Sequence, residues 1–125
     1  MIKLVYVGVG GFIGAVLRYT IGGWIHKTLD EPWLPIGTFT VNVLGCLFIG
    51  LLMGLAETRQ FLRPELRLLM VTGLLGSLTT FSTFAYESFS LFRDGESMAA
   101  IMNIGGQLLV GLIAVILGIA LSRAI

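Results

Sequence analysis

The sequence predicts an all-α membrane protein with four transmembrane helices, the third of them broken, and three observations support this. Hydrophobic residues make up 56% of the 125-residue chain and charged residues only 12%, about half the share in soluble domains. Four apolar stretches are long enough to cross a bilayer, which takes roughly 20 residues. The third stretch is interrupted by glycines and hydroxyls. We expect one domain over residues 1–125, with spans at about 2–25, 36–56, 66–92 and 98–121.

Three short hydrophilic links, at about residues 27–35, 57–65 and 93–97, separate the spans. Trp24 and Trp33 flank the first link, where aromatic residues are typical of a membrane interface. Four spans place both termini on one side of the membrane, and the positive-inside rule favours the cytoplasm for that side. Its basic residues are Lys3, Arg59, Arg63, Arg67 and Arg123, against Lys27 and Arg93 on the other side.

Composition also excludes several classes of protein. A net charge of +1 gives no electrostatic footprint for nucleic acid, so we expect no such partner. Cys46 is the only cysteine, so neither a disulfide framework nor a thiolate metal site is expected. No group of residues suggests catalysis, and we expect no enzymatic activity. A four-span bundle has little interior of its own, so we expect a homo-oligomer in the lipid bilayer.

The first span carries a stripe of small residues and one charge. Gly10, Gly14, Arg18 and Gly22 recur every four residues and therefore share a helix face, where small residues let another helix approach. Packing and a direct ligand role both remain open for these glycines. Arg18 is costly inside a span. It either gives positive potential to an anion vestibule or extends its charged end to the interface.

The second span begins with two polar residues on one face. Thr38 and Asn42 are four residues apart and so lie one turn from each other. The Asn42 amide has two N–H donors, which suit an anion. It either lines a pore or forms an interhelical hydrogen bond. Further along the span, Gly50 and Gly54 are better explained by packing.

The third span contains the run from Gly73 to Phe84, which is rich in glycine and hydroxyl residues. Backbone that leaves helical geometry at membrane depth must be buried in protein or line a wet cavity. We predict a break in the helix here, with Gly73 and Gly76 supplying the unusual backbone geometry. The alternative is an ordinary helix with small residues at a packing face.

The predicted break would free backbone carbonyl groups. Carbonyl oxygens at Gly76 and Thr79, three residues apart, are good ligands for a hard monovalent cation. Glu87 follows one turn beyond Phe84 and is the most plausible half-buried carboxylate. Alternatively, Glu87 lies near the interface and pairs with Arg93.

Aromatic and hydroxyl side chains follow the break. If this part is helical, Phe81 and Phe84 are one turn apart and face the same way. The positive edges of their rings can line an anion path, although packing alone would also explain the pair. Ser82 and Thr83 could donate hydrogen bonds to a dehydrated anion.

The fourth span has a polar stripe on an apolar helix. Asn103, Gln107 and Gly111 recur every four residues. The stripe either completes a polar track or bonds another helix, and both interpretations remain open.

Three motifs together resemble the Fluc family of small fluoride channels, also called CrcB. The run from Gly10 to Tyr19 is similar to the family's opening signature. Gly37-Thr38 followed by Val41-Asn42 is similar to its second motif, and Gly73 to Phe84 to its third and most specific one. Together they cover three of the four expected helices, in order and at family spacing.

The resemblance implies a prokaryotic plasma-membrane protein that exports fluoride passively. It implies an antiparallel, dual-topology homodimer with two pores and a structural, non-transported Na+ at its centre. The Na+ would be held by the carbonyls of Gly76 and Thr79. The fluoride path would include Asn42, Phe81 and Phe84, with hydroxyls nearby. The other path residues are Thr38, Ser82, Thr83 and Gln107, and the vestibule residues are Arg18 and Glu87.

Two positions depart from the family pattern. Ser77 stands where a second glycine is frequent, and a fourth-span serine of some relatives falls on Gly111. The main alternative function is a small four-span proton-coupled exporter. Such a carrier needs a carboxylate at mid-membrane depth, whereas the acidic residues here lie in or near the predicted links.

Overall fold

The computed structural model describes residues 1–29, 33–59 and 63–125, and regular structure there is entirely helical. Four segments of these residues are long and apolar enough to cross a membrane: Ile2–Thr28, Ile36–Thr58, Pro64–Arg93 and Ser97–Ala124. The predicted all-α fold with four possible spans is therefore confirmed. The elements are α1 (Ile2–Thr28), α2 (Ile36–Arg59), α3 (Pro64–Arg67), the π-helix η1 (Leu68–Leu75), α4 (Gly76–Leu78), α5 (Phe81–Arg93) and α6 (Ser97–Ala124).

The helices extend slightly beyond the spans predicted from hydropathy. Glu57 and Thr58 were expected in a link but belong to α2, and Arg93 ends α5. Apolar composition marks only the lipid-crossing part, whereas a helix continues until its backbone is interrupted. Pro64 opens α3, and Gly95, with a φ of 84°, forms the turn before α6. Residues 30–32 and 60–62 of the first two links lie outside the described residues.

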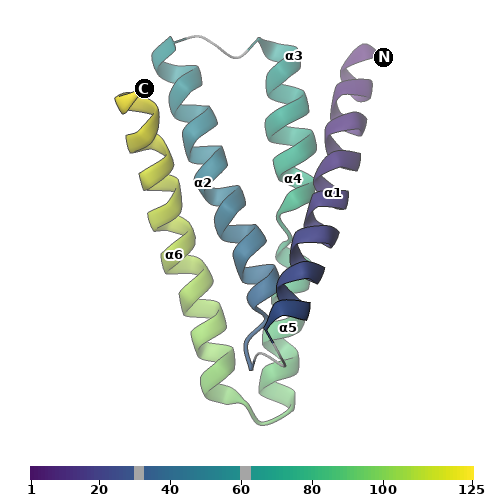
Figure 1. Cartoon of the computed structure of the whole chain (residues 1–125), viewed down its shortest axis with the longest axis vertical. Helices are drawn as coiled ribbons and strands as arrows, with labels where there is room; N and C mark the ends of the chain where they lie inside the picture. Colours follow the sequence, from purple (N-terminus) through teal and green to yellow (C-terminus); the bar gives the residue numbers. More distant parts are fainter. Residues whose placement is uncertain (30–32, 60–62) are drawn as a thin grey trace.

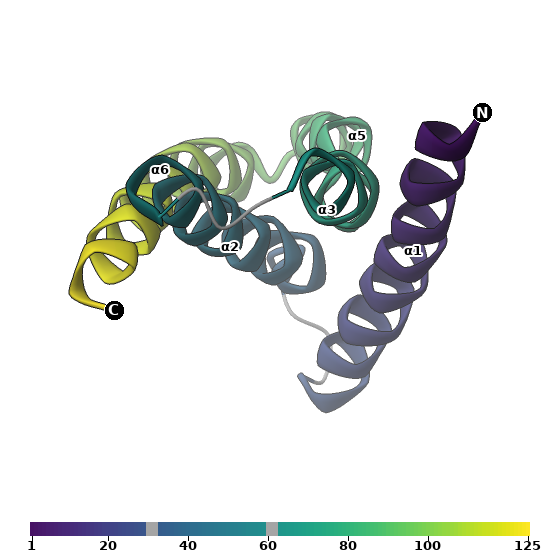
Figure 2. The same ribbon diagram turned by 90° about the horizontal axis from the view of Figure 1, so that it is seen from above.

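The helices form a splayed bundle (Figure 1). α2 packs along α6, while α1 packs against η1 and α4. Seen from above, α1 and α6 lie on opposite sides of the bundle (Figure 2). Both termini lie at the same end (Figure 1), as four spans require.

Glycines explain how closely α1 approaches the third span. A Cβ atom on Gly10 or Gly14 would collide with backbone atoms of η1, including those of Leu74. A Cβ atom on Gly73 would lie 2.7 Å from the Val7 carbonyl oxygen. The first-span stripe therefore serves packing at Gly10 and Gly14, one of the two interpretations that the sequence left open.

Small residues also bring α2 and α6 together. A Cβ atom on Gly50 would collide with the backbone of Val115, and one on Gly54 with the Ser122 side chain. Gly118 on α6 approaches the α2 backbone in the same way. Packing, the explanation favoured for Gly50 and Gly54, is confirmed.

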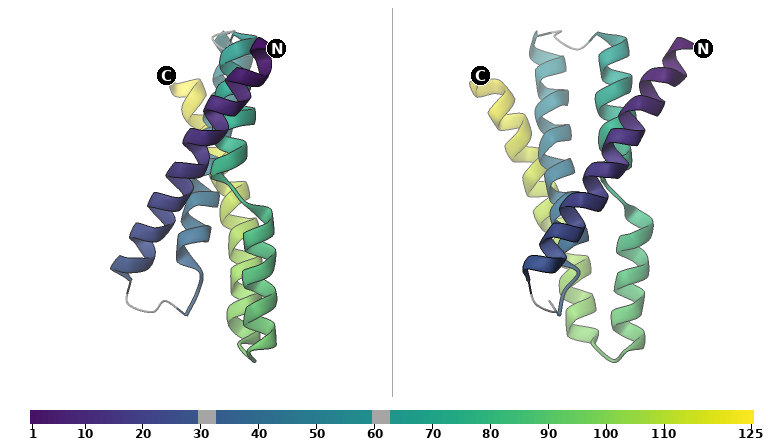
Figure 3. Two further views of the ribbon diagram at one scale, coloured as in Figure 1. Left: turned by 90° about the vertical axis from the view of Figure 1, so that its right-hand side faces the viewer. Right: turned by 45° about the vertical axis from the view of Figure 1, so that its right-hand side comes forward.

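The third span is broken between α4 and α5, as predicted. Thr79 (φ −80°, ψ 154°) and Thr80 (φ −147°, ψ 115°) are extended, and the chain visibly steps sideways between the two helices (Figure 3). Gly73 and Gly76 are helical, so the prediction that they supply the geometry of the break was wrong. Extended backbone is accessible to threonine. Gly73 is needed instead for the close approach of α1, whereas a Cβ atom on Gly76 would meet only the Val71 carbonyl oxygen, at 3.7 Å.

Candidate functional site

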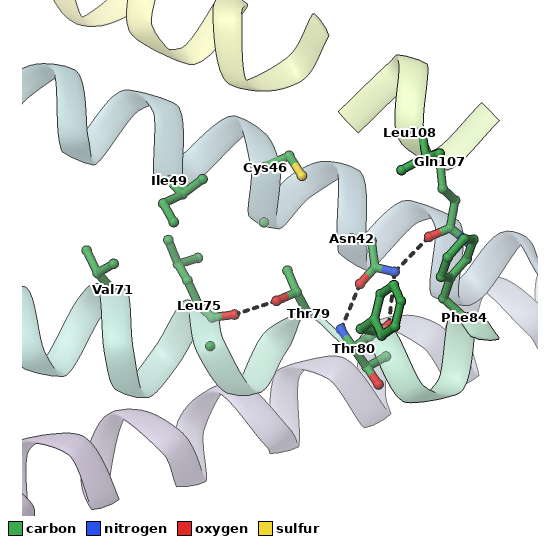
Figure 4. Close-up of a pocket in the computed structure, with 13 residues that line it drawn as sticks. Asn42, Cys46, Ile49, Val71, Leu75, Thr79, Thr80, Phe84, Gln107 and Leu108 are labelled. Atoms are coloured by element: carbon green, nitrogen blue, oxygen red, sulfur yellow. Dashed lines mark hydrogen bonds between the residues drawn. The ribbon is translucent and has the colours of Figure 1, made fainter. Parts of the chain in front are cut away.

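A cavity of about 350 Å³ opens beside the break, between α2, the third span and α6. Its polar end is formed by Asn42, Thr79, Thr80 and Gln107, and Cys46, Ile49, Val71 and Leu75 line the apolar part (Figure 4). Phe81, Phe84 and Gly76 also line it. The cavity therefore brings together six of the residues predicted for the fluoride path or the cation site: Asn42, Phe81, Phe84, Gln107, Gly76 and Thr79.

The Asn42 side chain holds the unwound backbone of Thr80. Its Oδ1 accepts a hydrogen bond from the Thr80 N–H at 2.8 Å, and its Nδ2 donates to the Thr80 carbonyl at 3.3 Å (Figure 4). An extended residue at membrane depth has no helical partner for either group, and each unsatisfied group is costly there. Asn42 supplies both partners, so this one amide lets the helix break.

A network of side-chain amides continues from Asn42 across α6 to α5. Asn42 Nδ2 donates to Gln107 Oε1 at 2.7 Å, and Gln107 Nε2 donates to Asn103 Oδ1 at 3.0 Å. Asn103 Nδ2 donates to Ser88 Oγ at 2.9 Å, and Ser88 Oγ donates to the Phe84 carbonyl at 2.8 Å. We call Asn42, Gln107, Asn103 and Ser88 the amide network.

The polar stripe of the fourth span forms hydrogen bonds to other helices, one of the two interpretations that the sequence left open. Gln107 bonds to α2 and Asn103 bonds to α5. Asn103 and Ser88 are only 2% and 5% exposed, so their polar groups depend on one another. Neither was predicted as a site residue. The four-residue spacing of Asn103 and Gln107 was a signal for Asn103, whereas Ser88 had none.

Phe81 and Phe84 lie together at the cavity. Their ring centroids are 5.7 Å apart and their planes are inclined by 52°. The two rings share one side of α5, as predicted. Phe81 is 79% exposed on the single chain, so its ring is available to a partner or to an ion.

The break diverts the two amide groups that would normally bond Gly76 and Thr79. In an α-helix, the N–H of each residue bonds the carbonyl four residues earlier. The Thr80 N–H donates instead to Asn42, and the Thr83 N–H donates to the Thr80 hydroxyl at 3.3 Å. The carbonyls of Gly76 and Thr79 are thereby released from those partners, which is the condition for binding a cation.

Glu87 pairs with the second span. Thr38 Oγ1 donates to a Glu87 carboxylate oxygen at 2.7 Å, while the other oxygen is buried without a hydrogen-bond partner among the described residues. Arg93 pairs with Asp94 at 3.0 Å, so the suggested Glu87–Arg93 pair was wrong. Glu87 lines a second cavity of about 350 Å³, next to the link between α1 and α2.

Four of the predicted residues line neither cavity: Thr38, Ser82, Thr83 and Arg18. Ser82 and Thr83 are exposed, and their hydroxyls lie 3.4 and 3.0 Å from the Thr80 hydroxyl at the start of α5. Arg18 is half-buried on α1 and lines neither cavity. Thr80, in contrast, was not predicted as a site residue, although it caps α5 and is the residue that Asn42 holds.

The fold and site define a small multi-pass membrane protein with a cavity at a broken transmembrane helix, and the end of that cavity next to the break is polar. The family model described as "CrcB-like protein, Camphor Resistance (CrcB)" matches residues 5–119. The chain belongs to this family, which confirms the resemblance seen in the sequence.

Individual relatives cover nearly the whole chain. A protein of Chloroflexus aurantiacus named "Fluoride-specific ion channel FluC" is 50% identical over 123 residues, 98% of this chain and 97% of the relative. One of the same name from Maridesulfovibrio salexigens is 44% identical over 125 residues, 100% and 98% of the two chains. "Fluoride-specific ion channel FluC 1" of Methanosarcina acetivorans is 44% identical over 118 residues, 94% and 88%. These names denote channels rather than enzymes, in agreement with the sequence.

Proposed function

We propose that this protein is a fluoride-selective channel that lets fluoride leave the cell down its electrochemical gradient. The observation that carries the proposal is the cluster of amide and hydroxyl groups at the end of the cavity next to the break, in a chain of the CrcB family whose relatives are named fluoride-specific channels. Fluoride is small and strongly hydrated, so a path for it must replace water with other donors. Amide and hydroxyl hydrogens and the positive ring edges of Phe81 and Phe84 provide them.

We infer that the working unit is an antiparallel homodimer with two pores. Gly76, Phe81, Ser82 and Thr83 are exposed on the single chain, and polar groups facing lipid are costly. A second copy would cover them. Thr79 lies 15 residues after Pro64 and 14 before Arg93, the two ends of the third span (79 − 64 and 93 − 79). A two-fold axis in the membrane plane would therefore bring the two breaks face to face at the bilayer centre.

The carbonyls of Gly76 and Thr79 would hold a structural Na+ between the two copies. Two such carbonyls from each chain would give four oxygen ligands, which suit a hard monovalent cation. The described residues contain no group of three or more His, Cys, Asp or Glu side chains that could hold a metal ion, so backbone oxygens are the better donors here. The ion would fix the two breaks against each other without being transported.

The remaining predicted residues would serve the approaches to the path. Thr38 on α2 and Glu87 in the middle of α5, which are joined by a hydrogen bond, would form a vestibule that exchanges ions with water. Arg18 would add positive potential for an arriving anion. The hydroxyls of Ser82 and Thr83 would contribute donors near the break.

Purified protein in liposomes loaded with fluoride tests the function. A channel is expected to release fluoride rapidly, to carry a membrane current and to exclude chloride. The alternative, a proton-coupled exporter, would release fluoride only with counter-movement of protons. Absence of fluoride efflux from liposomes that contain correctly folded protein would overturn the proposal.

The assembly has its own test. Light scattering of the detergent-solubilised protein is expected to give the mass of a dimer, and replacement of Na+ by N-methylglucamine is expected to lower the melting temperature of that dimer. A monomer that conducts fluoride would refute the homodimer. A dimer whose stability does not depend on Na+ would refute the structural ion alone.

A further inference from the structure

We propose that Ser88 and Asn103 are positioning residues that aim one N–H group of Gln107 at the anion path. This inference rests on the proposed fluoride channel, and it assigns a role to two buried residues distant from the break. It depends on the direction of each hydrogen bond in the amide network, from the Phe84 carbonyl to the Thr80 N–H.

The direction is fixed from the α5 end. The Phe84 carbonyl can only accept, so the single hydroxyl hydrogen of Ser88 is used on it. Ser88 Oγ can then only accept from Asn103, which must present its Nδ2 at 2.9 Å. This places Asn103 Oδ1 toward Gln107, which must present its Nε2 at 3.0 Å.

The opposite end of the network requires the same direction. The Thr80 N–H can only donate, so Asn42 must present Oδ1 to it. Asn42 Nδ2 then faces Gln107 Oε1 at 2.7 Å. Since a backbone acceptor and a backbone donor close the two ends, turning over any one amide would set two like groups against each other at both its contacts.

The fixed direction decides which donor remains for an ion. Asn42 uses both Nδ2 hydrogens, one on Gln107 and one on the Thr80 carbonyl. Gln107 Nε2 uses one hydrogen on Asn103, and its side chain is half-buried at the wall of the cavity. Asn103 Nδ2 also has a second hydrogen, but Asn103 is buried and does not line the cavity. The second hydrogen of Gln107 Nε2 is therefore the amide donor that the network leaves for the anion, while Asn42 orients Gln107 and holds the break.

Nitrogen-15 labelling of glutamine tests this directly, because the chain contains only Gln60 and Gln107. The substitution Gln60→Glu removes the other glutamine, so that the only labelled side-chain amide signals are those of Gln107. In halide-free samples we expect two well-separated Nε2 proton shifts, one for the bonded and one for the free hydrogen. Added fluoride should move the free one selectively, and chloride should not.

Variants at Ser88 separate positioning from general stability. Ser88→Ala removes the acceptor that holds Asn103, so Gln107 keeps its orienting bond from Asn42 but its Nε2 is no longer held firmly on the Asn103 side. The two Nε2 protons should then lose their separate response, and fluoride efflux should fall by about tenfold, roughly the effect of one hydrogen bond. Ser88→Thr keeps the hydroxyl and should restore both readouts. Ser122→Ala is the matched control: Ser122 is also buried and also donates to its own helix, at 2.7 Å to Ile119, outside the network.

Two results would overturn the proposal. One is efflux and glutamine signals in Ser88→Ala that equal those of the unmodified protein. The other is a Gln107 amide that does not respond to fluoride in protein that conducts it. A protein without fluoride efflux would instead refute the channel function, and the two proton shifts in halide-free samples would still report whether the amide is held.

Discussion

Asn42→Asp is expected to lower fluoride efflux by about three orders of magnitude at neutral pH. Aspartate keeps the oxygen that accepts from the Thr80 N–H at 2.8 Å, but it loses both donors and adds a negative charge beside the anion path. Two like charges 4 Å apart repel by about 4 kcal/mol at an effective dielectric constant of about 20. A barrier raised by that amount slows passage roughly 10³-fold.

A fluoride electrode follows efflux from liposomes, and circular dichroism and light scattering check the fold and the assembly. Gln60→Glu is the matched control, because it makes the same amide-to-acid change in the hydrophilic link that the sequence predicts at about residues 57–65. The control should conduct like the unmodified protein. If Asn42→Asp protein releases fluoride at the normal rate, Asn42 does not belong to the fluoride path.

The position of the break was predictable because its composition conflicts with its surroundings. Hydroxyl residues such as Thr79 and Thr80 have no role on a lipid-facing surface, and their grouping indicated irregular backbone. The role of the glycines was not predictable in the same way. Glycine suits both unusual dihedral angles and close packing, and only the position of α1 shows that Gly73 contacts Val7 and Gly10.

The sequence was sufficient to predict which residues belong to the site, but not which of them form hydrogen bonds with one another. Asn42, Gln107 and Phe81 were found because polar or paired aromatic side chains in a span require an explanation. Their hydrogen bonds depend on how each helix is rotated about its axis, which one sequence does not determine. The same limit applies to Glu87, whose partner proved to be Thr38 on α2 rather than Arg93 on its own helix.

Gly14→Ala is expected to destabilise the protein by about 3 kcal/mol, at the upper end of the usual cost of overpacking a well-filled site. A Cβ atom on Gly14 would collide with the Leu74 carbonyl and lie 3.0 Å from the Leu78 nitrogen. These are backbone atoms of η1 and α4, which cannot turn aside as a flexible side chain would. α1 would have to move away from the segment that leads into the break, so fluoride efflux should fall as well.

Thermal unfolding in detergent measures the loss, which corresponds to roughly 10 °C in melting temperature. Gly8→Ala is the matched control on the same helix, because a Cβ atom there meets no other atom within 4 Å. Alanine is the better helix former by about 1 kcal/mol, so the control should be as stable as the unmodified protein or slightly more stable. Equal melting temperatures for the two variants would mean that α1 does not need its close approach to the third span, and the packing role assigned to Gly14 would be wrong.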